Sequence, residues 1–122
     1  MKIDRVAAEG RNLFTGYGDG YVEVNGRRLT ASLIVAADKL VDWDVRSAAE
    51  LTAVHVEAVL ALKPGLVLLG SGRAFAFPEP AVLMPLHRAR IGVEVMDTRA
   101  ACRTYNILLG EDRDVLAALI VD

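Results

Sequence analysis

The fold of this chain is decided at residues 66–72, Leu66-Val67-Leu68-Leu69-Gly70-Ser71-Gly72, where an apolar run ends in two glycines. An uninterrupted apolar run of this length is typical of a strand that is buried on both faces. A second strand pattern follows at residues 91–96, and a helical pattern at residues 81–90 lies between the two. Because a strand–helix–strand unit is almost always parallel and right-handed, we predict a parallel βαβ crossover.

A β-hairpin is predicted near the N-terminus, at Asn25-Gly26. Both central positions of a two-residue type I′ turn require positive φ, which this dipeptide tolerates well. The turn places Val22 opposite Leu29, which is an apolar pair. It also places Glu23 opposite Arg28, a pair of opposite charges. We expect the second strand to continue and to bury one face, formed by Leu29, Ala31, Leu33 and Val35.

A helical stretch is predicted between these two units. Ser47-Ala48-Ala49-Glu50 has the spacing of a capping box and opens the stretch. Thr52 is a second possible start, so the stretch is allowed one break, and Lys63-Pro64-Gly65 stops it. The residues at helical spacing, which we expect to face the core, are Leu51, Val54, Ala58, Val59 and Leu62.

The last third of the chain contains one more helix and one ambiguous segment. Asp97 or Thr98 caps a helix that runs to about Leu109, with Gly110 as its C-terminal stop. Residues 115–121 are compatible with either a strand or a helix. Together the patterns predict the α/β class, with a single compact domain that contains a mixed β-sheet, an N-terminal β-hairpin and a parallel βαβ crossover.

Length, charge and cysteine content exclude several classes of protein. The 122 residues suffice for one domain, residues 1–122. Lys and Arg number 14 and Asp and Glu 16, and the formal charge of -2 argues against a nucleic-acid binder. No apolar run approaches the roughly 20 residues that a membrane-spanning helix requires. A single cysteine, Cys102, excludes an internal disulfide and suits a reducing cytoplasm.

The predicted crossover brings two distant segments to one edge of the sheet. Because parallel strands end at the same edge, Gly70-Ser71-Gly72 and the helix start at Asp97 are predicted to be neighbours, where open α/β sheets hold ligands. The free N–H groups of a helix start attract anions. A tight turn is the simpler interpretation, since the glycine pair lacks the P-loop and dinucleotide signatures. The negative charge of Asp97 also opposes an anion there.

The helix that starts at this edge carries a polar face. Arg99, Arg103 and Asn106 lie at positions i, i+4 and i+7 of the helix. They form either a solvated face that pairs with nearby acids, or a surface that recognises a partner protein or an acidic ligand. The candidate surface for a partner or ligand therefore consists of Gly70, Ser71, Gly72, Asp97, Thr98, Arg99, Arg103 and Asn106.

The sequence offers few residues for catalysis or metal binding. Cys102 with His55 or His87 contains the ingredients of a nucleophilic pair. A cysteine between Ala101 and Arg103 on a helix is more often a packing residue, however. Two isolated histidines lack the spacing of a metal-ligand set. We therefore predict no catalytic residue, no metal site and no cofactor.

A longer motif resembles the signature of a known family. Residues 92–106, Gly-Val-Glu-Val-Met-Asp-Thr-Arg-Ala-Ala-Cys-Arg-Thr-Tyr-Asn, resemble the Mth-type family of unknown function. That family includes a mitochondrial complex I assembly factor and an adipogenesis-associated protein. Residues 68–72 match a site where the family has Gly-Thr-Gly, and residues 111–113 a site where it favours Glu-Gly-Arg. The resemblance implies a compact α/β domain with a mixed sheet and no established catalytic residues.

These observations predict a non-enzymatic domain that interacts with a protein partner as an accessory or assembly factor. The assembly role is transferred by analogy with the mitochondrial members of the family, because one fold hosts many functions. The alternative is a protein that binds a small anionic ligand, or an enzyme, with its site at the Gly70/Asp97 edge. A pocket with convergent polar groups at this edge favours the alternative.

Overall fold

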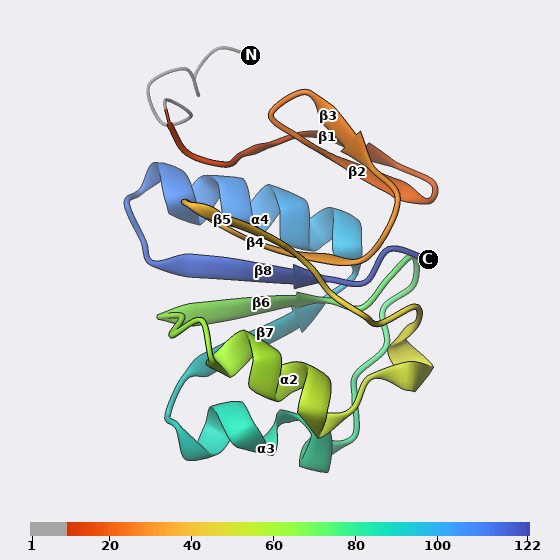
Figure 1. Ribbon diagram of the computed structural model, residues 1–122, viewed down its shortest axis with the longest axis vertical. Helices are drawn as coiled ribbons and strands as arrows, with labels where there is room; N and C mark the ends of the chain where they lie inside the picture. The colour runs from red at the N-terminus through yellow and green to blue at the C-terminus, as the bar shows by residue number, and fades with distance from the viewer. Residues whose placement is uncertain (1–9) are drawn as a thin grey trace.

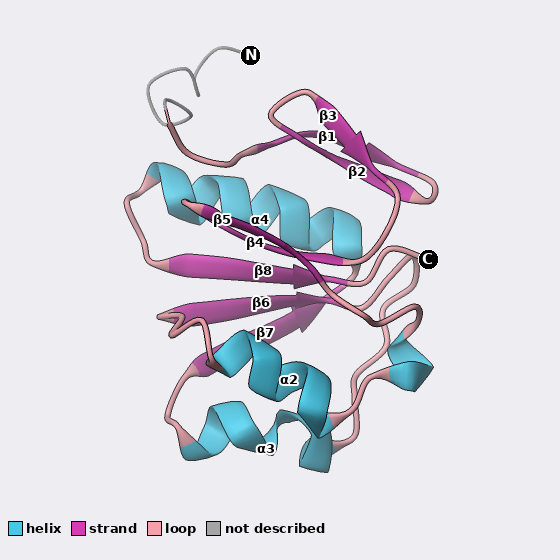
Figure 2. Ribbon diagram, in the orientation of Figure 1, coloured by secondary structure: helices cyan, strands magenta, loops and turns pink. Residues whose placement is uncertain are grey.

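Two β-sheets, with a helix between them, form the core of residues 10–122, which the computed structural model describes (Figure 1). The larger sheet carries α4 (Thr98–Gly110) on one face and α2 (Ala53–Leu60) and α3 (Pro80–Arg88) on the other. The smaller sheet lies against the opposite side of α4 (Figure 2). The protein is a mixed α/β domain, as the sequence predicts.

The predicted crossover forms the centre of the larger sheet. β6 (Leu66–Gly70) is parallel to β7 (Gly92–Met96), with α3 between them in the chain, so the prediction is confirmed. β6 is also parallel to β8 (Val115–Leu119), the segment whose pattern was ambiguous. β4 (Leu33–Ala36) pairs antiparallel with β8 and with β5 (Lys39–Asp42), which gives the strand order β5-β4-β8-β6-β7.

The smaller sheet contains the predicted hairpin. β2 (Tyr21–Val24) pairs antiparallel with β3 (Arg27–Leu29) and, on its other side, with β1 (Phe14–Gly18). The turn residues Asn25 and Gly26 have φ angles of 50° and 83°, in the left-handed region that a type I′ turn requires. The predicted register is confirmed, with Val22 opposite Leu29 and Glu23 opposite Arg28.

The second strand of the hairpin does not continue as predicted. β3 ends at Leu29, Ala31 is exposed, and the chain then enters β4 of the other sheet. The cause is the bonding of Ser32, whose carbonyl accepts from the N–H of Trp43 (3.1 Å) and whose Oγ accepts from the N–H of Val121 (2.9 Å). These bonds attach the chain to the larger sheet, so the expected continuous face is divided between two sheets.

The helical stretch is broken once, as Thr52 allows. A single 3-10 turn, η1 (Ala48–Glu50), precedes α2. The capping box predicted at Ser47 is wrong, because Glu50 accepts a hydrogen bond from the N–H of the residue before Ser47 (3.3 Å). The box forms instead at the start of α2, where the N–H of Thr52 donates to Nδ1 of His55 (3.0 Å).

Two details of the helices differ from the predicted pattern. Val54 is 72% exposed, because α2 starts only at residue 53 and turns Val56 and Val59 toward the core. α4 includes Gly110, and the residue in the left-handed region after it is Asp112, with φ of 62°. A helix stop needs one residue that tolerates this conformation, and aspartate tolerates it better than most side chains.

The larger sheet separates two hydrophobic cores. Leu68 of β6 lies in the core under α4 and the smaller sheet, whereas Val67 and Leu69 lie in the core under α2 and α3. The strand is therefore buried on both faces, as its uninterrupted apolar run predicts. In the first core the rings of Tyr105 and Phe14 pack edge to face, with 5.2 Å between their centroids.

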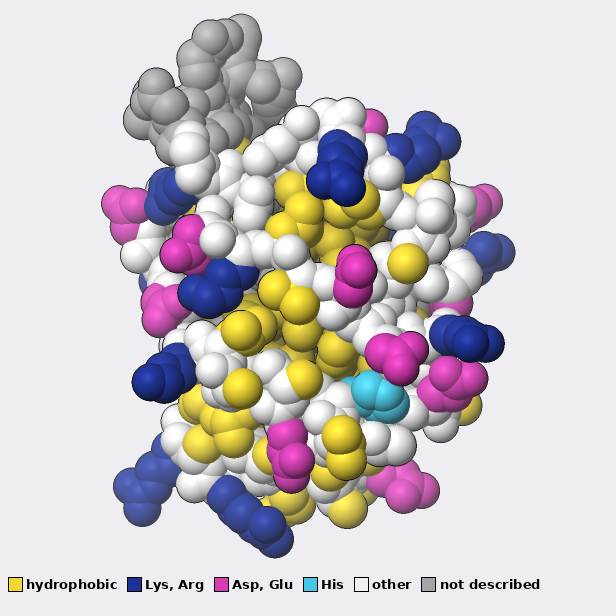
Figure 3. Space-filling model, viewed as in Figure 1, with side chains coloured by type: hydrophobic (Ala, Val, Ile, Leu, Met, Phe, Trp, Pro, Cys, Tyr) yellow, Lys and Arg dark blue, Asp and Glu magenta, His cyan; other side chains and the backbone are white. Residues whose placement is uncertain are grey.

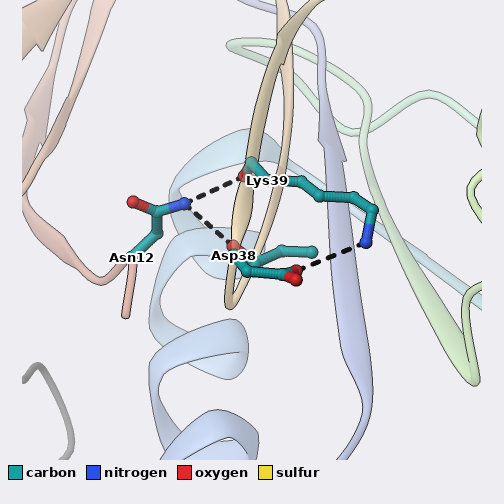
Figure 4. Close-up of polar contacts among 4 residues, drawn as sticks. Asn12, Asp38 and Lys39 are labelled. Atoms are coloured by element: carbon teal, nitrogen blue, oxygen red, sulfur yellow. Dashed lines mark hydrogen bonds and ion pairs between the residues drawn. The ribbon is translucent and has the colours of Figure 1, made fainter. Parts of the chain in front are cut away.

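A half-buried asparagine connects the chain before β1 to the turn between β4 and β5 (Figure 4). Asn12 donates from Nδ2 to the carbonyls of Ala36 (3.0 Å) and Lys39 (2.9 Å), and from its N–H to the carbonyl of Ala37 (2.9 Å). Its own carbonyl accepts from the hydroxyl of Tyr105 (2.9 Å). These bonds join the smaller sheet, the larger sheet and α4.

Candidate functional site

The two segments that the topology predicts to be neighbours meet at the carboxyl ends of β6 and β7. The N–H of Ser71 donates to the carbonyl of Met96 (2.8 Å), and the N–H of Thr98 donates to the carbonyl of Gly72 (2.9 Å). The buried hydroxyl of Thr98 accepts from the N–H of Gly72 (2.9 Å) and donates to the carbonyl of Ile120 (2.7 Å). The segments that follow β6, β7 and β8 are therefore joined by one cluster of hydrogen bonds.

Close packing explains the two glycines. A Cβ atom at Gly70 would lie 2.9 Å from Oγ1 and 3.0 Å from Cα of Thr98. Gly72 has a φ of 112°, and a Cβ atom there would lie 2.7 Å from Oδ2 of Asp122. Glycine thus lets the start of α4 and the segment after β8 approach the end of β6. This is the tight strand-exit turn of the simpler interpretation.

Two N–H groups at this edge bond carboxylates of the chain itself. A carboxylate oxygen of Asp97 accepts from the N–H of Ala100 (2.9 Å), which makes Asp97 the predicted cap of α4. A carboxylate oxygen of Asp122 accepts from the N–H of Arg73 (2.8 Å), while the Asp122 carbonyl accepts from the Arg73 guanidinium (3.2 Å). The cavity beside them measures about 20 Å³, which is room for a single water.

The arginines of the candidate surface point toward the smaller sheet. Arg99 forms an ion pair with Asp19, in the turn between β1 and β2, at 2.6 Å. Arg103 donates to the hydroxyl of Tyr17 (2.8 Å), and this hydrogen bond raises the pKa of Arg103. Both side chains stay exposed, and the pairing of Arg99 with an acid agrees with the solvated face, one of the two alternatives.

Asn106 has a structural role that its sequence position did not reveal. Its Oδ1 accepts from the N–H of Phe14 (2.9 Å), and its Nδ2 donates to the carbonyl of Phe14 (2.7 Å). The side-chain amide thereby pairs with β1 as a neighbouring strand would. Asn106 therefore holds the smaller sheet against α4, at some distance from the glycine pair.

Two exposed phenylalanines, which no sequence pattern singled out, lie a few residues after the glycine pair. Phe75 and Phe77 are 60% and 65% exposed. The loop that carries them is held by Ser71, whose Oγ donates to the carbonyl of Ala74 (2.8 Å) and accepts from the N–H of Ala76 (3.0 Å). The sequence signal for these residues is weak. Two aromatic residues precede Pro78 and Pro80, and prolines disfavour regular structure without deciding whether a segment is exposed.

A cavity of about 460 Å³ opens beside this loop, on the face of the sheet that α2 and α3 cover. Its only buried polar side chain is that of Ser71, and the hydroxyl is already bonded within the loop. Small-molecule sites of this size normally hold several convergent polar groups, which this lining does not supply. The lining consists of Ala48, Ala49, Leu51, Leu69, Ser71, Ala76, Phe77, Pro78, Glu79, Val82 and Ile120.

The candidate nucleophile is a core residue. Cys102 is 1% exposed, and burial raises the pKa of its thiol to about 12. A buried thiol that stays protonated at neutral pH is a poor nucleophile. His55 uses Nδ1 to accept from Thr52 in the capping box of α2. Within residues 10–122, no three His, Cys, Asp or Glu side chains lie close enough to hold one metal ion.

Comparison with known proteins identifies the family to which a chain with this fold belongs. Residues 14–120 match the model of a protein family of unknown function, DUF498/DUF598. The solution structure of a Mth938-like domain from Bordetella pertussis superposes with a TM-score of 0.82 and 33% identity, over 95% of this chain and 87% of that one. The chain belongs to this family, as the motif at residues 92–106 predicts.

Particular relatives extend the comparison. A crystal structure of a Bordetella parapertussis protein is 40% identical, with a TM-score of 0.87 over 93% of this chain and 98% of that one. NADH dehydrogenase [ubiquinone] 1 alpha subcomplex assembly factor 3 of Bos taurus is 35% identical over 103 residues. That match covers 83% of this chain and 55% of the relative, so the chain spans about half the length of the assembly factor.

One further finding concerns membranes. Among the helices of residues 10–122, none combines the length and the apolar composition that crossing a bilayer demands.

Proposed function

We propose that this protein is a non-enzymatic accessory factor that binds a partner protein during the assembly of a larger complex. The observation that carries the proposal is the exposed pair Phe75 and Phe77 beside an apolar cavity of about 460 Å³. The relationship to a complex I assembly factor supports the assembly role. A cytoplasmic location, and a partner other than nucleic acid, are parts of the same proposal.

The energetics of exposed aromatic rings support an interface. A large apolar side chain gains little by remaining in water, and contiguous exposed apolar surface on a folded protein usually marks an interaction site. Phe75 and Phe77 are carried by a loop whose shape Ser71 fixes, so little conformational entropy is lost when a partner covers them. Buried aromatic anchors also supply much of the binding energy in protein interfaces.

The surface that the sequence predicts is adjacent to this loop. We propose that Gly70-Ser71-Gly72, Asp97 and Thr98 act as its rigid base, since their hydrogen bonds position the loop. Arg99 and Arg103 form its polar margin on the side of the smaller sheet. Asn106 holds that sheet in place through its hydrogen bonds to Phe14.

The alternative, a small anionic ligand at the Gly70/Asp97 edge, has less support. An anion there must displace the carboxylate of Asp122 from the N–H of Arg73, or that of Asp97 from the N–H of Ala100. We therefore expect inorganic phosphate to leave the melting temperature unchanged. A rise in melting temperature that Arg103→Glu removes would favour the alternative instead, because a ligand that binds only the folded state stabilises it.

Site-specific photocrosslinking in the native cell tests the proposal. A photoreactive benzoylphenylalanine replaces Phe77 in the full chain, and the matched control carries it at Ile107 of α4, which is 62% exposed and outside the cavity lining. We expect a discrete protein adduct at position 77 and none of the same mass at 107. The proposal is wrong if position 77 gives no adduct, or if both positions give the same set.

A further inference from the structure

We infer that the cavity beside Phe77 receives an apolar side chain from a partner segment that carries lysine or arginine next to it. This inference rests on the proposed function and adds the chemistry of the partner: a basic, amphipathic segment. The observations that carry it are the apolar lining, the acidic rim and the engagement of the nearby arginines with groups of the chain itself.

The interior of the cavity selects for an apolar group. Leu51, Leu69, Val82 and Ile120 contribute hydrocarbon surface, and the hydroxyl of Ser71 is already bonded in both directions. An apolar group that covers this hydrocarbon surface is removed from water, which is favourable. A cavity of about 150 Å³ accommodates benzene, so one of about 460 Å³ has room for a leucine or phenylalanine side chain.

The rim of the cavity is acidic. Glu79 is exposed and belongs to the lining, and Glu50 is exposed between the lining residues Ala49 and Leu51. None of the lining residues is a lysine or an arginine. In Figure 3, acidic side chains lie over η1 and the neighbouring end of α2, with basic side-chain surface directly beside them. Neither glutamate belongs to the ion pairs found among residues 10–122, which join Arg11 to Asp112, Lys39 to Asp38 and Arg99 to Asp19. One carboxylate oxygen of Glu50 accepts a hydrogen bond from the backbone N–H of Arg46 (3.3 Å).

Among the described residues, three arginines close to the rim form no ion pair with its glutamates. Arg46 is exposed and bonds Glu50 through its backbone N–H. Arg73 starts the phenylalanine loop, but its guanidinium donates to the carbonyl of Asp122 and it lines the small cavity on the other side of Gly72. Arg99 lines that small cavity too, where it pairs with Asp19. A partner therefore meets apolar surface and negative charge together, and complementarity requires that it be apolar and positive.

The same charges favour a protein over a lipid surface as the occupant. Exposed phenylalanines on a loop also insert into bilayers, but cytoplasmic leaflets carry negative charge that attracts basic residues. Glu50 and Glu79 would be repelled by anionic lipid. The acidic rim therefore points to a basic polypeptide segment.

Fluorescence anisotropy with two synthetic peptides tests the inference on the full chain. Both peptides place leucine at helical spacing, and the remaining positions are lysine in one and glutamate in the other. We expect the lysine peptide to bind and the glutamate peptide not to bind. The double variant Glu50→Lys, Glu79→Lys should weaken binding of the lysine peptide by about tenfold, which is the size of effect that two rim charges produce. Phe77→Ser should weaken it as well.

The matched control is Glu94→Lys, Glu111→Lys, which changes the net charge equally at two exposed glutamates outside the cavity lining. This control should bind the lysine peptide as the wild type does. Equal weakening in both double variants overturns the inference, because it indicates a general charge effect. Equal affinity for both peptides, with a loss in Phe77→Ser, also overturns it but leaves the proposed function intact.

Two other outcomes decide against the inference. Sedimentation of the protein with vesicles of phosphatidylglycerol and phosphatidylcholine, lost in Phe77→Ser, assigns the loop to a membrane surface. Absence of peptide binding together with absence of a photocrosslink at position 77 removes both the inference and the proposed function.

Discussion

The two faces of the five-stranded sheet are covered by different elements. One face carries α4, a helix of 13 residues, and the smaller sheet behind it, and the core between them contains Leu68 and Tyr105 at 0% exposure. The other face carries α2 and α3, helices of 8 and 9 residues, and leaves a cavity of about 460 Å³. Both faces carry a buried core, and the face under α2 and α3 is the one that we propose for binding.

A similar division exists at the carboxyl edge of the strands. On the α4 side, the hydroxyl of Thr98 satisfies two backbone groups, and Asp97 satisfies a third. A few residues away, Phe75 and Phe77 extend into solvent. Binding loops that are carried by a rigid scaffold are common in proteins, because the scaffold fixes the position of the loop.

The largest effect is expected from a matched pair of core substitutions in β6. Leu68 and Leu69 are neighbours in one strand, 0% and 3% exposed, and face opposite cores. We expect Leu68→Ala to lower the free energy of unfolding by about 4 kcal/mol and Leu69→Ala by about 2 kcal/mol, within the usual range for such truncations. Leu69 loses less because its side chain already borders the open cavity. Urea denaturation of both variants measures the difference, and equal losses contradict the comparison.

The second prediction concerns the cluster of hydrogen bonds at the carboxyl ends of β6, β7 and β8. Thr98→Val removes the hydroxyl that bonds the N–H of Gly72 and the carbonyl of Ile120, and leaves both groups buried without a partner. We expect a loss of about 3 kcal/mol in the free energy of unfolding. Thr98→Ser keeps the hydroxyl and should retain most of the stability. If both variants unfold at the same urea concentration, the hydroxyl does not hold the edge.

A third prediction follows from the buried thiol. The pKa of Cys102 is raised to about 12 by burial, so the folded state keeps its proton at pH values where the unfolded state loses it. Stability is therefore fully present below the unfolded pKa of about 9 and falls by roughly 1 kcal/mol per pH unit above it. Urea denaturation from pH 8 to pH 11 measures this slope, and Cys102→Ala should reduce it. A thiol that reacts rapidly with iodoacetamide in the folded protein at pH 7 contradicts the assignment.

The parts of the fold that could be predicted depend on local chemistry. The turn at Asn25-Gly26 needs only two residues with positive φ, and the buried strand at residues 66–70 needs only an apolar run. The transition between the two sheets could not be predicted, because it depends on bonds from Ser32 to Trp43 and to Val121, the second of which is 89 positions away. No local pattern records which strand such a segment will join.

The candidate site divides in the same way. The proximity of Gly70 and Asp97 follows from topology alone, because parallel strands end at one edge. The pairing of Arg99 with Asp19 and of Arg103 with Tyr17 depends on where the smaller sheet docks, which helical spacing does not specify. The exposure of Phe77 was also hidden, since an irregular segment can be packed or exposed.

The smallest effect on stability, and the sharpest test of the face under α2 and α3, is expected from Phe77→Ser. Phe77 is 65% exposed, so its removal costs few contacts, and we expect the free energy of unfolding to change by no more than about 0.5 kcal/mol. Arg103→Glu, on the margin of the other face, should change the free energy of unfolding equally little, because the guanidinium is exposed.

The two variants should differ in binding. Because Phe77 borders the cavity and Arg103 does not, the partner captured by the photocrosslink should lose affinity for Phe77→Ser by more than for Arg103→Glu, as measured by isothermal titration. The opposite order would move the interface to the α4 side and remove the functional distinction between the faces.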